Sequence, residues 1–138
     1  MIRVAKTDDE VKRCFPVVQQ LRTHLREGDF LATIRRQEAG GFHLAFLEDG
    51  GQVQGVAGFR VMDNLFSGRV LYVDDLVTDA TVRSRGYGKV LLEWLVEQAR
   101  AADCRSLELD SGVQRFDAHR FYLTNRMVIS SHHFRLEL

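Results

Sequence analysis

Lysine, proline and cysteine are scarce in this chain of 138 residues, and neither sign of charge is in excess. Only three lysines accompany sixteen arginines, and the 19 basic side chains are balanced by 19 acidic ones. Proteins that bind nucleic acid through its phosphates usually carry a clear surplus of basic residues. The balance therefore excludes a general polyanion binder, and we expect no nucleic-acid partner.

Long apolar runs are also missing. The uninterrupted ones, such as residues 70–73, extend over about four residues, and the N-terminus has no apolar stretch of signal-peptide type. The two cysteines, Cys14 and Cys104, have no metal-ligand spacing and fit two reduced thiols rather than a disulfide framework. We expect a soluble, cytoplasmic protein with no membrane partner and one globular domain over residues 1–138.

Hydrophobic periodicity predicts a mixed α/β fold. A strand over residues 2–5 precedes a helix that starts at a capping box, Thr7-Asp8-Asp9-Glu10, and Pro16 is expected to kink or divide that helix. A second helix is predicted over residues 30–38. Period-two alternation from Phe42, with Asp49-Gly50-Gly51 as a turn, then predicts a hairpin whose returning strand covers residues 52–61.

The second half of the chain predicts a crossover. Strands are expected over residues 70–77 and 106–110, with an amphipathic helix over residues 88–102 between them. Such a connection is right-handed and makes the two strands parallel neighbours. A short helix over residues 117–124 and a last strand over residues 128–136 complete the predicted layer.

A glycine-rich segment separates the third strand from the crossover helix. Its residues are Arg83, Ser84, Arg85, Gly86, Tyr87, Gly88 and Lys89. A Walker A loop and a dinucleotide fingerprint both require residues that this segment lacks. Glycines that turn backbone N–H groups toward one point at a helix start, with three cations nearby, have the physical outline of a pyrophosphate site.

Arg83-x-x-Gly86-x-Gly88, after a hydrophobic strand and at the start of an amphipathic helix, resembles motif A of the GNAT superfamily, the Gcn5-related N-acetyltransferases. Residues 71–78 are similar to the family's central strand, and Ala118-His119-Arg120-Phe121-Tyr122 is similar to its Ala-x-x-x-Tyr helix. The resemblance implies a mixed, mostly antiparallel sheet, flanked by helices, in which a central parallel strand pair splays apart for the cofactor.

The resemblance also implies acetyl-coenzyme A as co-substrate. Backbone N–H groups from Arg85 to Lys89 would hold its pyrophosphate, and Leu76, Val77 and Thr78 would pair with its pantetheine arm. Where the family often has asparagine for that arm, this chain has Arg115. Arg115 therefore departs from the pattern, which leaves the contact with the arm open; its alternative partner would be a phosphate or an acidic acceptor.

Acetyl transfer to an amine requires a base, because an alkyl ammonium titrates near 10.4 and only about one part in two thousand is neutral at pH 7. Asp74 and Asp75 are the candidates, with Asp75 preferred. Strand alternation places them on opposite faces unless a bulge intervenes. Asp110 is a third carboxylate at the end of the neighbouring strand. By the resemblance, Tyr122 would return a proton to the departing thiolate, and a backbone N–H near Val77 would stabilise the carbonyl oxygen.

Covalent transfer through cysteine is disfavoured, because Cys104 is at the wrong end of its strand and Cys14 has no activating neighbour in sequence. No metal is expected, since the consecutive His132 and His133 point to opposite faces of a strand.

We predict an N-acetyltransferase acting on a small-molecule or protein amine. The alternative is a non-catalytic sensor or interaction module of the same fold that binds acyl-coenzyme A. Relatives are often dimers, so a homodimer paired through the final strand is the expected assembly.

Overall fold

The computed structural model describes all residues 1–138, and the chain divides into two compact units, Met1–Glu108 and Leu109–Leu138. The first unit is built on a sheet with the strand order β1-β2-β3-β4-β5. The strands are β1 (Ile2–Val4), β2 (Phe42–Asp49), β3 (Gln52–Asn64), β4 (Gly68–Thr78) and β5 (Ser106–Leu109). The first four are antiparallel neighbours, and β4 and β5 form the predicted parallel pair.

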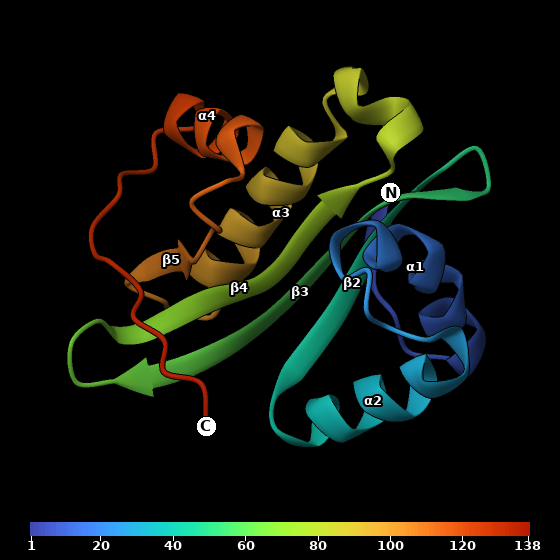
Figure 1. Ribbon diagram of the computed structural model, residues 1–138, viewed down its shortest axis with the longest axis horizontal. Helices are drawn as coiled ribbons and strands as arrows, with labels where there is room; N and C mark the ends of the chain where they lie inside the picture. The colour runs from blue at the N-terminus through green and yellow to red at the C-terminus, as the bar shows by residue number, and fades with distance from the viewer. The chain divides into compact units, whose positions relative to one another are not determined.

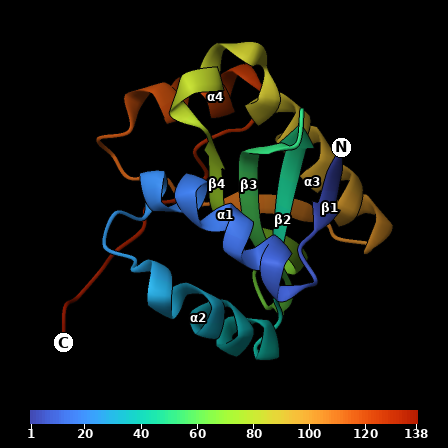
Figure 2. The same ribbon diagram turned by 90° about the vertical axis from the view of Figure 1, so that its right-hand side faces the viewer.

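Helices cover both faces of this sheet. Helices α1 (Asp8–Leu21) and α2 (Glu27–Ala39) lie against one face, and α3 (Tyr87–Ala101) lies against the other (Figures 1 and 2). The first face carries a buried core that includes Phe15, Phe30 and Phe46. On the second face, the ring of Phe59 meets Trp94 of α3 edge-on at 5.9 Å between centroids. The sheet is therefore packed on both sides.

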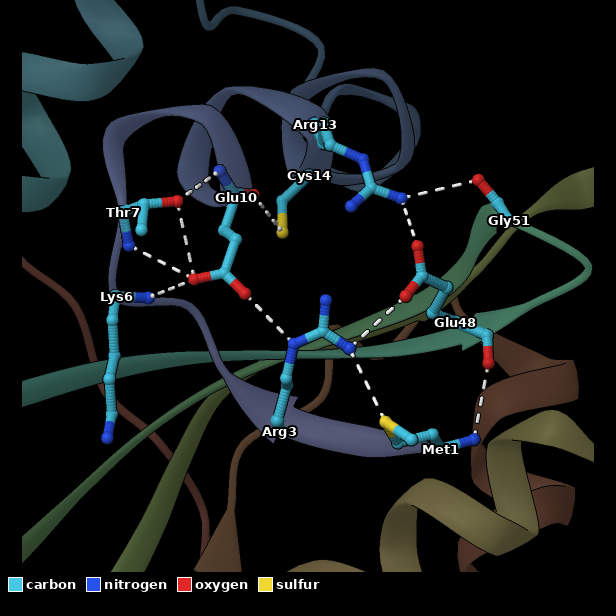
Figure 3. Close-up of polar contacts among 9 residues, drawn as sticks. All are labelled: Met1, Arg3, Lys6, Thr7, Glu10, Arg13, Cys14, Glu48 and Gly51. Carbon is cyan, nitrogen blue, oxygen red and sulfur yellow. Dashed lines mark hydrogen bonds and ion pairs between the residues drawn. The ribbon is translucent and has the colours of Figure 1, made fainter.

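The start of α1 is fixed by a polar network. The Thr7 side chain accepts the Glu10 N–H at 3.1 Å, and the Glu10 carboxylate accepts the Thr7 N–H at 3.1 Å, which is the predicted capping box. Arg3 of β1 bridges Glu10 of α1 and Glu48 of β2, at 2.9 and 3.2 Å (Figure 3). Backbone and guanidinium donors together lower the pKa of Glu10 to about 2. The network ties the first helix to the sheet.

Two sequence predictions are corrected by the structure. The division expected at Pro16 is wrong, because α1 continues from Asp8 to Leu21 with Pro16 inside it, while a kink there stays a prediction. The strand predicted over residues 128–136 is absent, because the chain has no regular secondary structure after Asn125. A period-two pattern makes a strand only where a neighbouring strand pairs with its backbone, and this segment has no such ladder. The homodimer expected through that segment stays a prediction.

The second unit contains α4 (Phe116–Thr124). Asp117 stands in its first turn, and the Tyr122 carbonyl accepts the N–H groups of Asn125 and Met127, both at 3.1 Å. None of the helices in either unit has the length and apolar character that crossing a bilayer requires.

Candidate functional site

A bulge in β4 brings two consecutive carboxylates to one cavity. In the register with β3, Gly58 pairs with Asp75 and Phe59 pairs with Val73, so Asp74 is an extra residue without a partner position. An extra residue interrupts the alternation of a strand. Asp74 and Asp75 therefore both line the same cavity, although strict alternation predicts opposite faces.

Each of these carboxylates is held by an arginine from another element. Arg60 of β3 donates to both oxygens of Asp74, from Nε at 3.1 Å and from Nη2 at 2.8 Å. Arg22, just after α1, donates from Nε to Asp75 Oδ1 at 2.8 Å and from Nη2 to the Asp74 carbonyl at 2.8 Å. Such charge-assisted bonds fix the orientation of a carboxylate.

A glycine makes room for Asp75. A Cβ atom at Gly58 would lie 2.5 Å from Phe42 Cζ and 2.6 Å from Asp75 Oδ2. The Phe42 ring and the Asp75 carboxylate thus meet over the bare backbone of Gly58. Burial in this apolar surrounding raises the pKa of Asp75, and the hydrogen bond from Arg22 opposes that effect. A carboxylate with a raised pKa is a stronger base than an exposed aspartate.

The cavity beside the two carboxylates has a volume of about 420 Å³. Small-molecule sites usually measure roughly 300–1,000 Å³. Its wall combines residues from α1, α2, the connection between these helices, β2 and β4: Val18, Arg22, His24, Leu25, Phe30, Thr33, Ile34, Gln37, Phe42, Leu44, Tyr72, Asp74 and Asp75. A smaller cavity of about 230 Å³ shares His24, Leu25, Phe30 and Thr33 with it.

The carboxyl end of β4 extends past the short β5. The Arg105 N–H donates to the Arg69 carbonyl at 2.7 Å, at the start of both strands. Since parallel strands rise equally, the four residues of β5 reach about as far as Val73. Leu76, Val77 and Thr78 pair with β3 on one side, and their other edge lies beyond β5. An unpaired strand edge of this kind is what an extended ligand can join as an added strand.

The glycine loop follows β4. Residues Ala80–Arg85 form a 3-10 helix, and Gly86 then adopts a left-handed conformation with φ of 81°. Helix α3 begins at Tyr87, and no side chain caps its first turn. The backbone N–H groups of that turn are the donors to which helix termini bind anions. Arg83, Ser84 and Arg85 are exposed beside it.

Contacts from both sides hold this loop in place. The Gln20 side chain of α1 accepts the Ala80 N–H at 2.9 Å and donates to Asp79 at 3.2 Å. The Tyr87 hydroxyl donates to Asp49, at the tip of the β2–β3 hairpin, at 2.6 Å, which raises the pKa of Tyr87. Lys89 lies 3.9 Å from Glu93. The loop is therefore positioned by α1 and by the hairpin.

Other predicted residues lie in the second unit. Tyr122 is in α4, with its ring edge-on to Phe121 at 5.5 Å. Arg115 is the residue before α4. Asp110 lies 3.6 Å from His133. The roles given to Tyr122 and Arg115 stay predictions.

The thiol of Cys14 is unsuited to covalent transfer. It is fully buried in α1 and donates to the Glu10 carbonyl at 3.3 Å. Burial raises the pKa of Cys14 to about 12, so the reactive thiolate is not formed at neutral pH. No group of three or more His, Cys, Asp or Glu side chains has a metal-binding arrangement.

Sequence reasoning did not predict that Arg22 and Arg60 hold the two carboxylates, or that apolar side chains line the cavity. Arg22 and Arg60 are 53 and 14 residues from their carboxylate partners, and no local pattern marks such pairs. One signal was available, because Gly58 stands inside a strand, where glycine often marks a close approach.

The comparisons with known proteins concern the family and the fold. The sequence profile of the Acetyltransferase (GNAT) family matches residues 5–125. The N-acetyltransferase YhdJ of Bacillus subtilis strain 168, itself uncharacterized, is 36% identical over 133 residues, which cover 92% of this chain and 91% of YhdJ. An aminoalkylphosphonate N-acetyltransferase of Salmonella typhimurium is 40% identical over 63 residues, or 46% of this chain and 40% of that protein.

A solved structure extends the likeness to the fold. AAC(6')-Iy, in complex with a bisubstrate analogue that contains coenzyme A, superposes with a TM-score of 0.85 at 14% identity, over 100% of this chain and 97% of that one. At that identity the match shows the fold alone. The profile match over most of the chain and the full-length relative show more, and the chain belongs to the GNAT acetyltransferase family.

Proposed function

We propose that this protein is an N-acetyltransferase that moves an acetyl group directly from acetyl-coenzyme A to a primary amine in a ternary complex. The observation that carries the proposal is the bulge in β4, which presents Asp74 and Asp75 to one cavity immediately before the open edge at Leu76. The proposed base for the acceptor and the strand edge proposed to bind acetyl-coenzyme A therefore follow one another along β4.

The residues of the first unit fit the donor. Gly86 and the uncapped first turn of α3 are suited to a pyrophosphate, with Arg83 and Arg85 as exposed cations beside it. The edge of β4 at Leu76, Val77 and Thr78 fits the amide-containing pantetheine arm as an added strand would. When bound, acetyl-coenzyme A supplies a thioester carbonyl as the acetyl source.

Asp75 is the proposed base. It removes a proton from the acceptor ammonium, directly or through water, so that the neutral nitrogen attacks the carbonyl carbon. The C–N bond forms, the C–S bond breaks, and the thiolate takes a proton for which Tyr122 is the proposed donor on the ground of the family resemblance. The nitrogen releases its second proton to water as the amide forms, and Tyr122 regains a proton from water. A backbone N–H near Val77 is the proposed donor to the carbonyl oxygen. The cavity beside Asp75 is the proposed acceptor site.

The test is release of free thiol from acetyl-coenzyme A in the presence of a panel of primary amines, with the acetylated product identified by mass spectrometry. Asp75→Asn is expected to lower kcat by about 100-fold, within the usual range for loss of a general base. Asp74→Asn is the matched control on the same strand, and it is expected to have a smaller effect. Equal effects of the two substitutions would contradict the assignment of Asp75.

The alternative, a sensor that binds acyl-coenzyme A without turnover, predicts a different result. Calorimetry would detect coenzyme A binding that Gly86→Val weakens, since valine is strained at a positive φ. No amine in the panel would then cause thiol release. Thiol release with even one amine acceptor, together with its acetylated product, excludes the sensor.

A further inference from the structure

Part of the lining of the proposed acceptor cavity is hydrocarbon. Six of its thirteen lining residues are aliphatic or phenyl side chains: Val18, Leu25, Phe30, Ile34, Phe42 and Leu44. Phe30, Phe42 and Leu44 are almost fully buried and belong to the core of the first unit. A polar substrate group placed against these six side chains would lose its water without a replacement partner, whereas Thr33, Gln37 and Tyr72 line other parts of the cavity.

The charges around the cavity cancel in pairs. Arg22 neutralises Asp75 at 2.8 Å, and Arg60 neutralises Asp74 through two nitrogens. No other carboxylate lines the cavity. Asp29, in the first turn of α2, lines the smaller cavity and not this one. Within the larger cavity a polycation finds no unpaired carboxylate for its second ammonium, and an acidic substrate finds both arginines already engaged.

On the basis of the proposed function, we propose that the acceptor is a primary amine on an apolar body with no second charge, and that Arg22 is the residue that excludes polycations. The amine meets Asp75, and the hydrocarbon body lies along Leu25, Phe30 and Ile34. Because Arg22 already pairs with Asp75, a second ammonium in the cavity gains no net attraction that would offset the loss of its water.

Three acceptors share a six-carbon chain and differ only in the group at the end opposite the reacting amine. They are hexylamine, 1,6-diaminohexane and 6-aminohexanoate. The measurement is kcat/KM in the thiol-release assay. We expect hexylamine to exceed the other two by at least about tenfold, and kcat/KM to rise by about fourfold for each methylene added from propylamine upward while the cavity fills, as burial of about 0.8 kcal/mol per methylene predicts.

Substitutions at Arg22 test the charge argument. Arg22→Met removes the guanidinium and leaves Asp75 unpaired, so the ratio of kcat/KM for the diamine to that for hexylamine should rise about tenfold. Arg22→Lys retains the positive charge and should leave this ratio within about twofold of the wild-type value. Because the result is a ratio of two substrates in one protein, a general loss of folded protein does not alter it.

A second variant does not depend on Arg22. Leu25 is half-buried and lines the cavity. Leu25→Gln should reduce kcat/KM for hexylamine more than for the diamine, because only hexylamine buries an apolar end. Equal losses for the two amines would contradict the role of the apolar wall.

The failures of the two proposals are distinguishable. If the diamine or the amino acid is acetylated as well as hexylamine is, the acceptor class proposed here is wrong while the acetyltransferase activity stands. The same conclusion follows if Arg22→Met leaves the substrate ratio unchanged. If no amine of any class is acetylated while coenzyme A binds, the proposed function itself is wrong, and this inference with it.

Discussion

Replacement of Gly58 by alanine tests the arrangement of the acceptor site directly. The new Cβ would lie 2.5 Å from Phe42 Cζ, 2.6 Å from Asp75 Oδ2 and 2.7 Å from Phe42 Cε2, closer than side-chain carbons normally approach other atoms. Phe42 is 3% exposed and has little space in which to move. The added methyl group must therefore displace the phenyl ring, the carboxylate or the strand.

The cost follows from the behaviour of overpacked cores. An extra methyl group in a close-packed interior destabilises a protein by about 1–3 kcal/mol. Exchange of glycine for alanine recovers up to about 1 kcal/mol through the unfolded chain. The free energy of unfolding should thus fall by about 1–2 kcal/mol, and Tm by roughly 3–10 °C. Because Asp75 moves, kcat/KM for amine acetylation should fall by about 100-fold, as a misplacement of about 1 Å can produce.

Gly28→Ala is the matched control. Gly28 lies in α2, and a Cβ there has no atom within 4 Å. Its alanine variant should be as stable as the wild type, or more stable by up to about 1 kcal/mol. Urea unfolding and the thiol-release assay on both variants provide the comparison. If Gly58→Ala unfolds and acetylates as Gly28→Ala does, Phe42 and Asp75 do not meet over Gly58.

Three further predictions concern the first helix. Thr7→Ala removes the capping hydroxyl of α1 and should lower the free energy of unfolding by about 1 kcal/mol in urea titrations. Alkylating reagents at neutral pH should leave Cys14 unmodified in the native state, because its pKa of about 12 and full burial suppress the thiolate; peptide mapping after denaturation is the control, and native modification would refute this. Glu10 has a pKa of about 2, below its usual 4.5, so its contribution to stability is complete above about pH 4.5 and is lost as the pH falls toward 2. Glu10→Gln should therefore flatten the stability profile between these values, and an unchanged slope would contradict the contacts of Figure 3.

Local patterns predicted the strands and helices of the first unit well. The capping box at Thr7, the turn at Gly50-Gly51 and the crossover helix after Gly86 each depend on residues within a few positions of one another. The prediction of a strand over residues 128–136 was wrong, because an alternating pattern does not show whether a neighbouring strand is present to pair with it. Pro16 failed as a divider of α1 because tertiary packing of residues on either side, Phe15 and Val17, holds the helix together.

The candidate site could be predicted from the sequence only where its functional residues are close together in the sequence. Asp74 and Asp75 stand out as consecutive carboxylates in an apolar strand, but the bulge that turns both to one cavity depends on the register with β3. The pairing of Asp75 with Arg22 crosses 53 residues, and Phe42 reaches the site from another strand. These features arise from tertiary packing, which one sequence without a structure does not specify.

At this site, arginine makes contacts that lysine could not make. Asp74 is held by two nitrogens of one guanidinium, and Arg22 spans a carboxylate and a backbone carbonyl at the same time. A lysine ammonium is a single point of charge and cannot hold both groups in a fixed plane. The carboxylates are consequently oriented and neutralised before any substrate arrives. If the proposed acceptor class is right, such a site gains little by attracting charge and selects through its apolar side chains. The length of an uncharged alkyl chain is then the variable to which the rate of acetylation should respond most strongly.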